Sequence, residues 1–127
     1  MIKIQKENFQ VDYEIEKIKS LSNEIGAVTN FIGYVRNINN SKKVKSIYVE
    51  VYEEMAIKSL KKICENAKNK WNLIDYLVIH RFGNLSINDK IVLVSTFSKH
   101  RKESFESCNF IMDYLKKEAP FWKKENY

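Results

Sequence analysis

Residues 110–124, FIMDYLKKEAPFWKK, combine a helical pattern, a break and an aromatic, basic segment. Met112 and Lys116 are four residues apart, so they share one face of the expected helix. Pro120 is the only proline of the chain. Because proline lacks a backbone donor and restricts the residue before it, we expect the helix to end one or two residues earlier. The chain can then fold back and bring Lys123 towards Lys116.

This segment has two interpretations. Two lysines beside methionine, phenylalanine and tryptophan side chains could form a pocket for an anionic ligand. Apolar surroundings disfavour the ammonium form of a lysine, which suits it to acid–base or nucleophilic chemistry. The alternative is a helix end with a solvated basic face, as most charge runs are. Spacing alone leaves both interpretations open, and we expect Lys117 to face solvent in either case.

Length and composition indicate one globular domain over residues 1–127, with 44% hydrophobic and 30% charged residues. No apolar run is long enough to span a membrane, and the first residues lack the apolar core of a signal peptide. We therefore expect a cytoplasmic location. The net charge of +6 favours an anionic partner: a phosphorylated small molecule, an acidic protein or a nucleic acid.

The cysteines, Cys64 and Cys108, are far apart and fall on apolar positions of helical patterns. We expect them to be buried structural thiols. The sequence also lacks zinc-site spacing, a phosphate-binding glycine loop and a Ser/His/Asp arrangement. We therefore expect neither a metal nor a cofactor.

The hydrophobic pattern alternates between the strand period and the helix period, in the order β-α-β-β-α-β-β-α. Strands joined by short loops favour an α+β fold with a mainly antiparallel sheet, and the first six elements alone fit a ferredoxin-like arrangement. Gly26 and Gly33 indicate a tight strand entry and a bulge or close backbone approach. The most apolar strand, 90–98, is expected at the centre of the sheet. The expected strands are 2–4, 25–36, 44–52, 73–81 and 90–98, and the expected helices are 13–22, 53–71 and about 102–118.

Other candidate site residues lie at strand ends. His100 and Arg101 follow the central strand, where a planar guanidinium and a titrating imidazole could bind phosphate, although a helix start that faces water is the alternative. His80 ends another strand but leads into a turn, so we expect local hydrogen bonds to satisfy it. Phe31 and Arg36 taken alone indicate one core aromatic residue and one exposed cation.

Several segments together resemble the large, catalytic subunit of molybdopterin synthase, the MoaE family. The resemblance covers the chain from about residue 25 and implies a fold of the α/β-hammerhead type in place of the ferredoxin-like arrangement. Family members usually continue past APFWK with a further segment that holds a tryptophan and basic residues. The matching segments are GAVTNFIGYVRN at 26–37, VIHRFGNLSINDKIVLV at 78–94, SKHRKESFESCNFIMDYLKKEAPFWKK at 98–124 and, more weakly, VEVYEEMAIKSLKKICENAKNKW at 49–71.

The resemblance implies a reaction and partners. Cyclic pyranopterin monophosphate (precursor Z) is converted to molybdopterin by installing two sulfurs as a dithiolene. The sulfur comes from a small ubiquitin-like subunit whose C-terminal Gly-Gly carries a thiocarboxylate. The family works as a heterotetramer around a central dimer of large subunits.

The resemblance also implies roles for individual residues. Lys116, in the DYLK motif, orients the thiocarboxylate and moves protons. Lys123, in APFWK, supports the anionic intermediates electrostatically. The implied substrate-binding residues are Phe31, Arg36, His100, Arg101 and Met112.

Two other functions remain open at this point. One is a non-catalytic basic module that binds an acidic ubiquitin-like sulfur-carrier protein. The other is a nucleic-acid binder, for which the segment Phe121-Trp122-Lys123 supplies aromatic and basic side chains. However, the chain lacks an RNA-binding signature, and its basic residues are spread over the predicted elements.

Overall fold

The computed structural model describes residues 1–39 and 41–127. Its main sheet has the strand order β1 (Ile2–Gln5), β6 (Asp75–Arg81), β8 (Lys90–Ser98) and β2 (Ala27–Tyr34). β1 runs parallel to β6, while β8 is antiparallel to both of its neighbours, β6 and β2. β8 lies inside the sheet and is buried from Ile91 to Ser98, as its continuous apolar run predicted.

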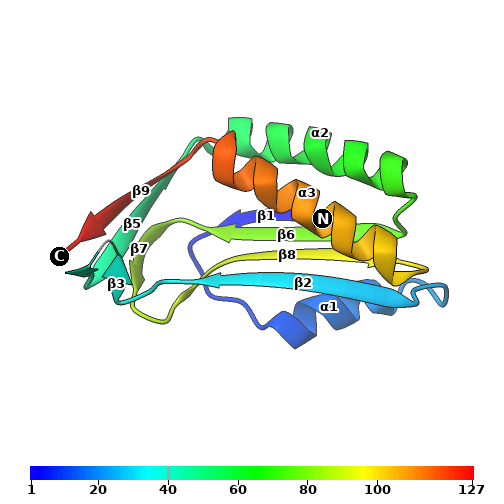
Figure 1. Cartoon of the computed structure of the whole chain (residues 1–127), viewed down its shortest axis with the longest axis horizontal. Coiled ribbons are helices and arrows are strands. Elements are labelled where there is room, and N and C mark those ends of the chain that lie inside the picture. Colours follow the sequence, from blue (N-terminus) through cyan, green and yellow to red (C-terminus); the bar gives the residue numbers. More distant parts are fainter. Residues whose placement is uncertain (40) are drawn as a thin grey trace.

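Helices cover both faces of this sheet (Figure 1). α2 (Glu53–Trp71) and α3 (Arg101–Lys117) pack on one face, and α1 (Val11–Lys19) lies on the other. The first expected helix begins two residues earlier than predicted and has no side-chain cap. α3 ends at Lys117, three residues before the buried Pro120, in agreement with the predicted break.

A second, smaller sheet projects beyond one end of the main sheet (Figure 1). Its strand order is β7 (Gly83–Ser86), β5 (Ser46–Val51) and β9 (Phe121–Asn126), all antiparallel. The short pair β3 (Ile38–Asn39) and β4 (Lys42–Lys43) lies nearby. The mainly antiparallel α+β fold is therefore confirmed. The ferredoxin-like arrangement is wrong, because β5 leaves the main sheet and pairs with β7 and β9.

Two glycines permit close backbone approaches. A Cβ atom on Gly26 would overlap the carbonyl oxygen of Lys99, so this tight strand entry requires glycine. At Gly33 the β2–β8 register shifts, which confirms the bulge expected there. Cys64 and Cys108 are both buried, as predicted. Among the described residues, no helix combines the length and apolar character needed to cross a membrane.

Candidate functional site

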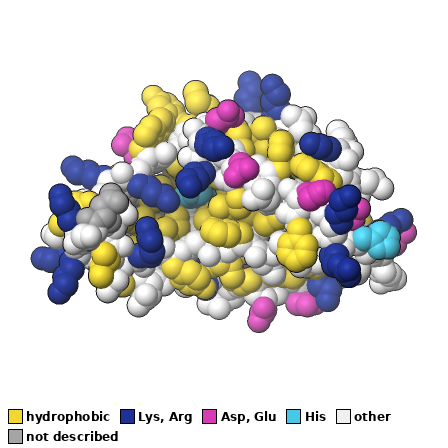
Figure 2. Space-filling view, viewed as in Figure 1, with side chains coloured by type: hydrophobic (Ala, Val, Ile, Leu, Met, Phe, Trp, Pro, Cys, Tyr) yellow, Lys and Arg dark blue, Asp and Glu magenta, His cyan; other side chains and the backbone are white. Residues whose placement is uncertain are grey.

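A pocket of about 620 Å³ opens where the C-terminal end of α3 meets the small sheet. In the space-filling view, lysine and arginine side chains gather over β3, β5 and β9, beside a hydrophobic strip along the middle of the molecule (Figure 2). The pocket lies between these two kinds of surface, so it can contact both an anion and an apolar group. Its lining includes Phe31, Arg36, His80, Met112, Lys116 and Lys123.

α3 supplies Met112 and Lys116, one helical turn apart. Lys116 is exposed and stands in the last turn of the helix, where the partial negative charge of the helix terminus favours a cation. Lys117 is exposed and contributes instead to a separate hollow with Ile63 and Phe110. The helical spacing therefore predicted correctly which of the two neighbouring lysines lines the pocket.

β9 supplies Lys123. This lysine pairs with the fully buried Val49 of β5, so both side chains point to the inner face of the small sheet. Burial lowers the pKa of Lys123 by desolvating its ammonium group, and the nearby Glu125 acts in the opposite direction. The Glu125 carboxylate accepts hydrogen bonds of 2.7 and 2.8 Å from the side-chain amide of Asn39. These hydrogen bonds partly offset the negative charge of the carboxylate.

β2 supplies Phe31, and Arg36 stands two residues after the end of this strand. A Cβ on Gly33 would lie 3.0 Å from Cγ1 of Val92 and 3.5 Å from the Phe31 ring, so the glycine lets this ring lie close to the strand. Beyond the bulge, the backbone of Val35 bonds to both Asn88 and Asp89, and Arg36 follows it immediately. Arg36 and Lys123 also line an adjoining hollow of about 180 Å³, so the two cations stand together between two cavities.

His80, at the end of β6, also lines the pocket. The expected local hydrogen bond is present, since Nδ1 lies 2.8 Å from the carbonyl oxygen of Arg81. The imidazole also stacks on Phe121, with centroids 3.8 Å apart and an angle of 18° between the planes. Burial lowers the pKa of His80 to about 4, so the ring is neutral at pH 7. Sequence reasoning missed its place in the pocket, and its position at a strand end was the available signal.

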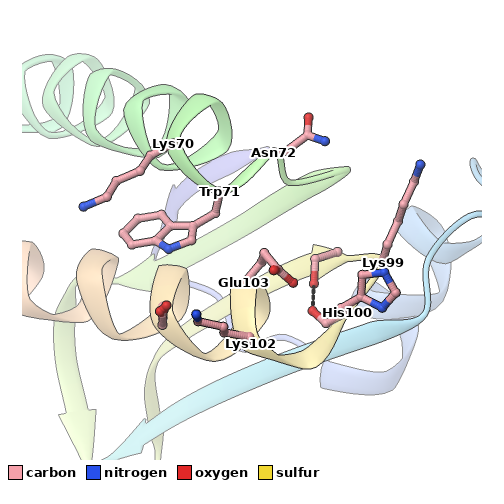
Figure 3. A pocket seen from close by; sticks show the side chains of 9 residues that line it. Lys70, Trp71, Asn72, Lys99, His100, Lys102 and Glu103 are labelled. Carbon is pink, nitrogen blue, oxygen red and sulfur yellow. Dashed lines mark hydrogen bonds between the residues drawn. The ribbon is translucent and has the colours of Figure 1, made fainter.

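His100 and Arg101 lie at the other end of α3. Lys116 follows His100 by 16 positions, which correspond to ~24 Å along the helix axis. His100 lines a different pocket, of about 420 Å³, together with Trp71 and Glu103 (Figure 3). Within one chain the structure therefore does not bring this pair together with Arg36, in contrast to the predicted common substrate site.

The comparisons with known proteins agree with this architecture. The family described as "MoaE protein" matches residues 4–118. A molybdopterin synthase catalytic subunit of Ralstonia nicotianae is 49% identical over 98% of this chain and 70% of its own length, and one of Vibrio cholerae is 46% identical over 98% and 82%.

Solved structures give the same result. A MoaE protein from Burkholderia ambifaria superposes with a TM-score of 0.90 at 41% identity, over 100% of this chain and 83% of its own. A molybdopterin synthase from Staphylococcus aureus gives a TM-score of 0.91 at 31% identity, over 98% and 90%. Sequence and structure both show that the chain belongs to the MoaE family.

Proposed function

We propose that this chain is the catalytic subunit of a molybdopterin synthase, a sulfurtransferase that converts cyclic pyranopterin monophosphate to molybdopterin. The observation that carries the proposal is the convergence of Arg36, Lys116 and Lys123 on one pocket walled by Phe31 and Met112. Three cations beside an apolar wall suit a ligand that combines a phosphate with a flat heterocycle.

The proposed chemistry consists of two exchanges of sulfur for oxygen. In each exchange a carbon–sulfur bond replaces a carbon–oxygen bond on the pterin side chain, while a carbon–oxygen bond replaces the carbon–sulfur bond of the partner. The partner is left with a carboxylate in place of its thiocarboxylate, so the exchange needs no external oxidant or reductant. Lys116 is free to reach the incoming thiocarboxylate and to move protons, and Lys123 stabilises the anionic intermediates.

The proposed sulfur donor is a small ubiquitin-like subunit with a C-terminal Gly-Gly thiocarboxylate. An extended, narrow tail of this kind can enter an open pocket, and its negative end would meet Lys116 and Lys123. We place the reaction in the cytoplasm, where Cys64 and Cys108 would stay reduced. Both thiols are buried, which supports a donor sulfur that comes from the partner.

The proposed roles of His100 and Arg101 require a second copy of the chain. β2 is one of the two edge strands of the main sheet, and an apolar hollow of about 290 Å³ beside it is lined by Phe31, Phe105 and Met112 among others. Two copies placed antiparallel along β2 would set the start of one α3 near the end of the other. His100 and Arg101 would then complete the neighbouring pocket.

Reconstitution tests the function directly. The chain is mixed with the thiocarboxylated small subunit and cyclic pyranopterin monophosphate, and the dithiolene product is measured. Product that forms only when all three components are present is the expected result. A stable two-protein complex without product would instead identify a non-catalytic binding module, and salt-sensitive binding to unrelated oligonucleotides would favour nucleic-acid binding.

A further inference from the structure

The imidazole of His80 is fixed from two sides. Its Nδ1 lies 2.8 Å from the carbonyl oxygen of Arg81, and its plane stacks on the Phe121 ring. The residue is only 5% exposed, yet it lines the pocket that holds Lys116 and Lys123. A side chain that only filled the core would not need its ring oriented by both a hydrogen bond and a stacking partner.

The hydrogen bond determines the tautomer. A carbonyl oxygen can only accept, so Nδ1 carries the proton and donates it to Arg81. In a neutral ring the other nitrogen, Nε2, is then left with a lone pair. Among the described residues, Nε2 has no hydrogen-bond partner, and it is not one of the fully buried unpaired polar atoms. The lone pair is therefore accessible from the pocket.

The other polar side chains of the pocket have the opposite character. Arg36 and the two lysines, when charged, can only donate hydrogen bonds. Tyr34 can donate or accept, but it is half exposed at the rim. Within the described part of the lining, His80 is the buried side chain with a free nitrogen acceptor. A ligand that offers only acceptors, such as a phosphate or carboxylate, would leave this lone pair unused.

We propose that Nε2 of His80 accepts a hydrogen bond from an N–H group of the substrate's heterocycle and so orients the ring in the pocket. This inference rests on the proposed function, because a pterin has ring N–H and exocyclic amino donors that a purely cationic pocket cannot satisfy. The cations would hold the anionic parts of the substrate, and His80 would select its donor edge. The predicted ligand class is therefore a heterocycle with N–H donors that also carries a phosphate.

His80 acts here as a binding and positioning residue rather than as a proton carrier. Its pKa is lowered to about 4 chiefly by burial, with a smaller effect in the same direction from the Lys123 ammonium. The remaining charged groups that face the pocket are Lys116 of α3 and Arg36 after β2, both cations. A ring that stays neutral across the physiological range provides a constant acceptor.

The test uses two substitutions. His80→Phe keeps an aromatic ring to stack on Phe121 but removes both nitrogens, while His80→Gln keeps an acceptor of similar reach. With the reconstituted complex we expect His80→Phe to raise KM for the pyranopterin roughly tenfold, the effect of one lost hydrogen bond, with a smaller change in kcat. We expect His80→Gln to recover most of the affinity. Equal KM values for His80→Phe and the unsubstituted protein would overturn the proposal.

Nitrogen NMR of histidine-labelled protein gives a second readout that does not depend on turnover. The chain has two histidines, so a His100→Gln variant assigns the signals. We expect the His80 ring to stay in the Nδ1–H form from pH 5 to 8 and its Nε2 resonance to shift when neopterin monophosphate is added. An imidazolium signal at pH 6, or an Nε2 signal unchanged at saturating neopterin monophosphate, would contradict the inference. If the unsubstituted complex makes no dithiolene while Nε2 still responds, the proposed function fails and the binding role stands.

Discussion

Lys123 lies directly opposite Val49 in the β5–β9 ladder, and Val49 has no exposed surface at all. The alternation of side chains along a strand therefore turns a lysine towards the interior of the small sheet. The neighbouring Lys124 pairs with Tyr48 and points to the outer face. Two adjacent lysines of β9 thus occupy different environments, and only one of them borders the pocket.

Replacing Lys123 with methionine should stabilise the fold while it removes activity. Because burial lowers the pKa of Lys123 in the folded state, charging it costs stability. The cost is complete below the folded-state pKa and disappears as the pH rises past the unfolded value of 10.5. Because the Lys123 side chain is still partly exposed to solvent, at pH 7 we expect the Tm of Lys123→Met to rise only by about 1 °C, and the gain should shrink towards pH 10.

Lys124→Met is the matched control for this measurement. Its side chain lies on the outer face, so its Tm should change little and without a trend with pH. Thermal melts at several pH values, followed by circular dichroism, compare the two variants. A Tm for Lys123→Met that is lower than that of Lys124→Met at pH 7 would contradict the claim that partial burial of the Lys123 ammonium group costs stability.

Lys116→Ala and Lys117→Ala form a second matched pair. Both residues are exposed at the end of α3, but only Lys116 lines the pocket. We expect Lys116→Ala to lower kcat at least ~100-fold, the range of a lost proton-transfer group, while Lys117→Ala remains within about twofold. Both variants should bind the small subunit normally in a titration. Near-normal turnover by Lys116→Ala would remove the central residue of the mechanism.

Mixing two inactive variants tests whether His100 and Arg101 act across a dimer. One protomer carries Lys116→Ala, and the other carries His100→Ala with Arg101→Ala. If the pocket is shared between copies, random exchange should restore about a quarter of the unsubstituted activity, because half of the dimers are mixed and each holds one intact site. If the pair acts within its own chain, the mixture should stay inactive. Each variant measured alone gives the baseline.

Gly26→Ala should destabilise the protein more than Gly33→Ala. The new methyl group at position 26 would overlap the backbone carbonyl of Lys99, which cannot move without disturbing the start of α3. At position 33 it would meet Cγ1 of Val92 at 3.0 Å, and this side chain can adjust. We expect a loss of ~2 kcal/mol or more for Gly26→Ala and less for Gly33→Ala, measured by urea unfolding. The opposite order would show that the strand entry is not the tighter contact.

The long periodic elements could be predicted from the sequence, and the site only in part. The expected helix 53–71 coincides with α2, and the expected strand 90–98 with β8, because each has one clear period over many residues. β7 and β9 were not predicted, since β7 has only four residues and β9 interleaves charges with aromatic residues. Both strands exist through pairing with β5, a long-range interaction that local pattern does not reveal.

The same limit applies to the pocket. Helical spacing placed Met112 and Lys116 together, the proline break brought Lys123 towards them, and the family resemblance added Arg36 and Phe31. The place of His80 in the pocket was not predicted, because a strand-end position alone does not reveal its stacking with Phe121, a contact between β6 and β9. The separation of His100 from Lys116 follows from the length of α3. Matching single residues to a family motif does not show how far apart those residues lie in the folded chain.

The pairing of β9 with β5 has a consequence for how the protein folds. The partner residues of the two strands are 70 to 80 positions apart in the chain. Forming the pair closes a long loop that contains both large helices, so it is a slow step compared with the formation of local elements. A folding intermediate in which β9 is still unpaired would lack the wall of the pocket that carries Phe121 and Lys123.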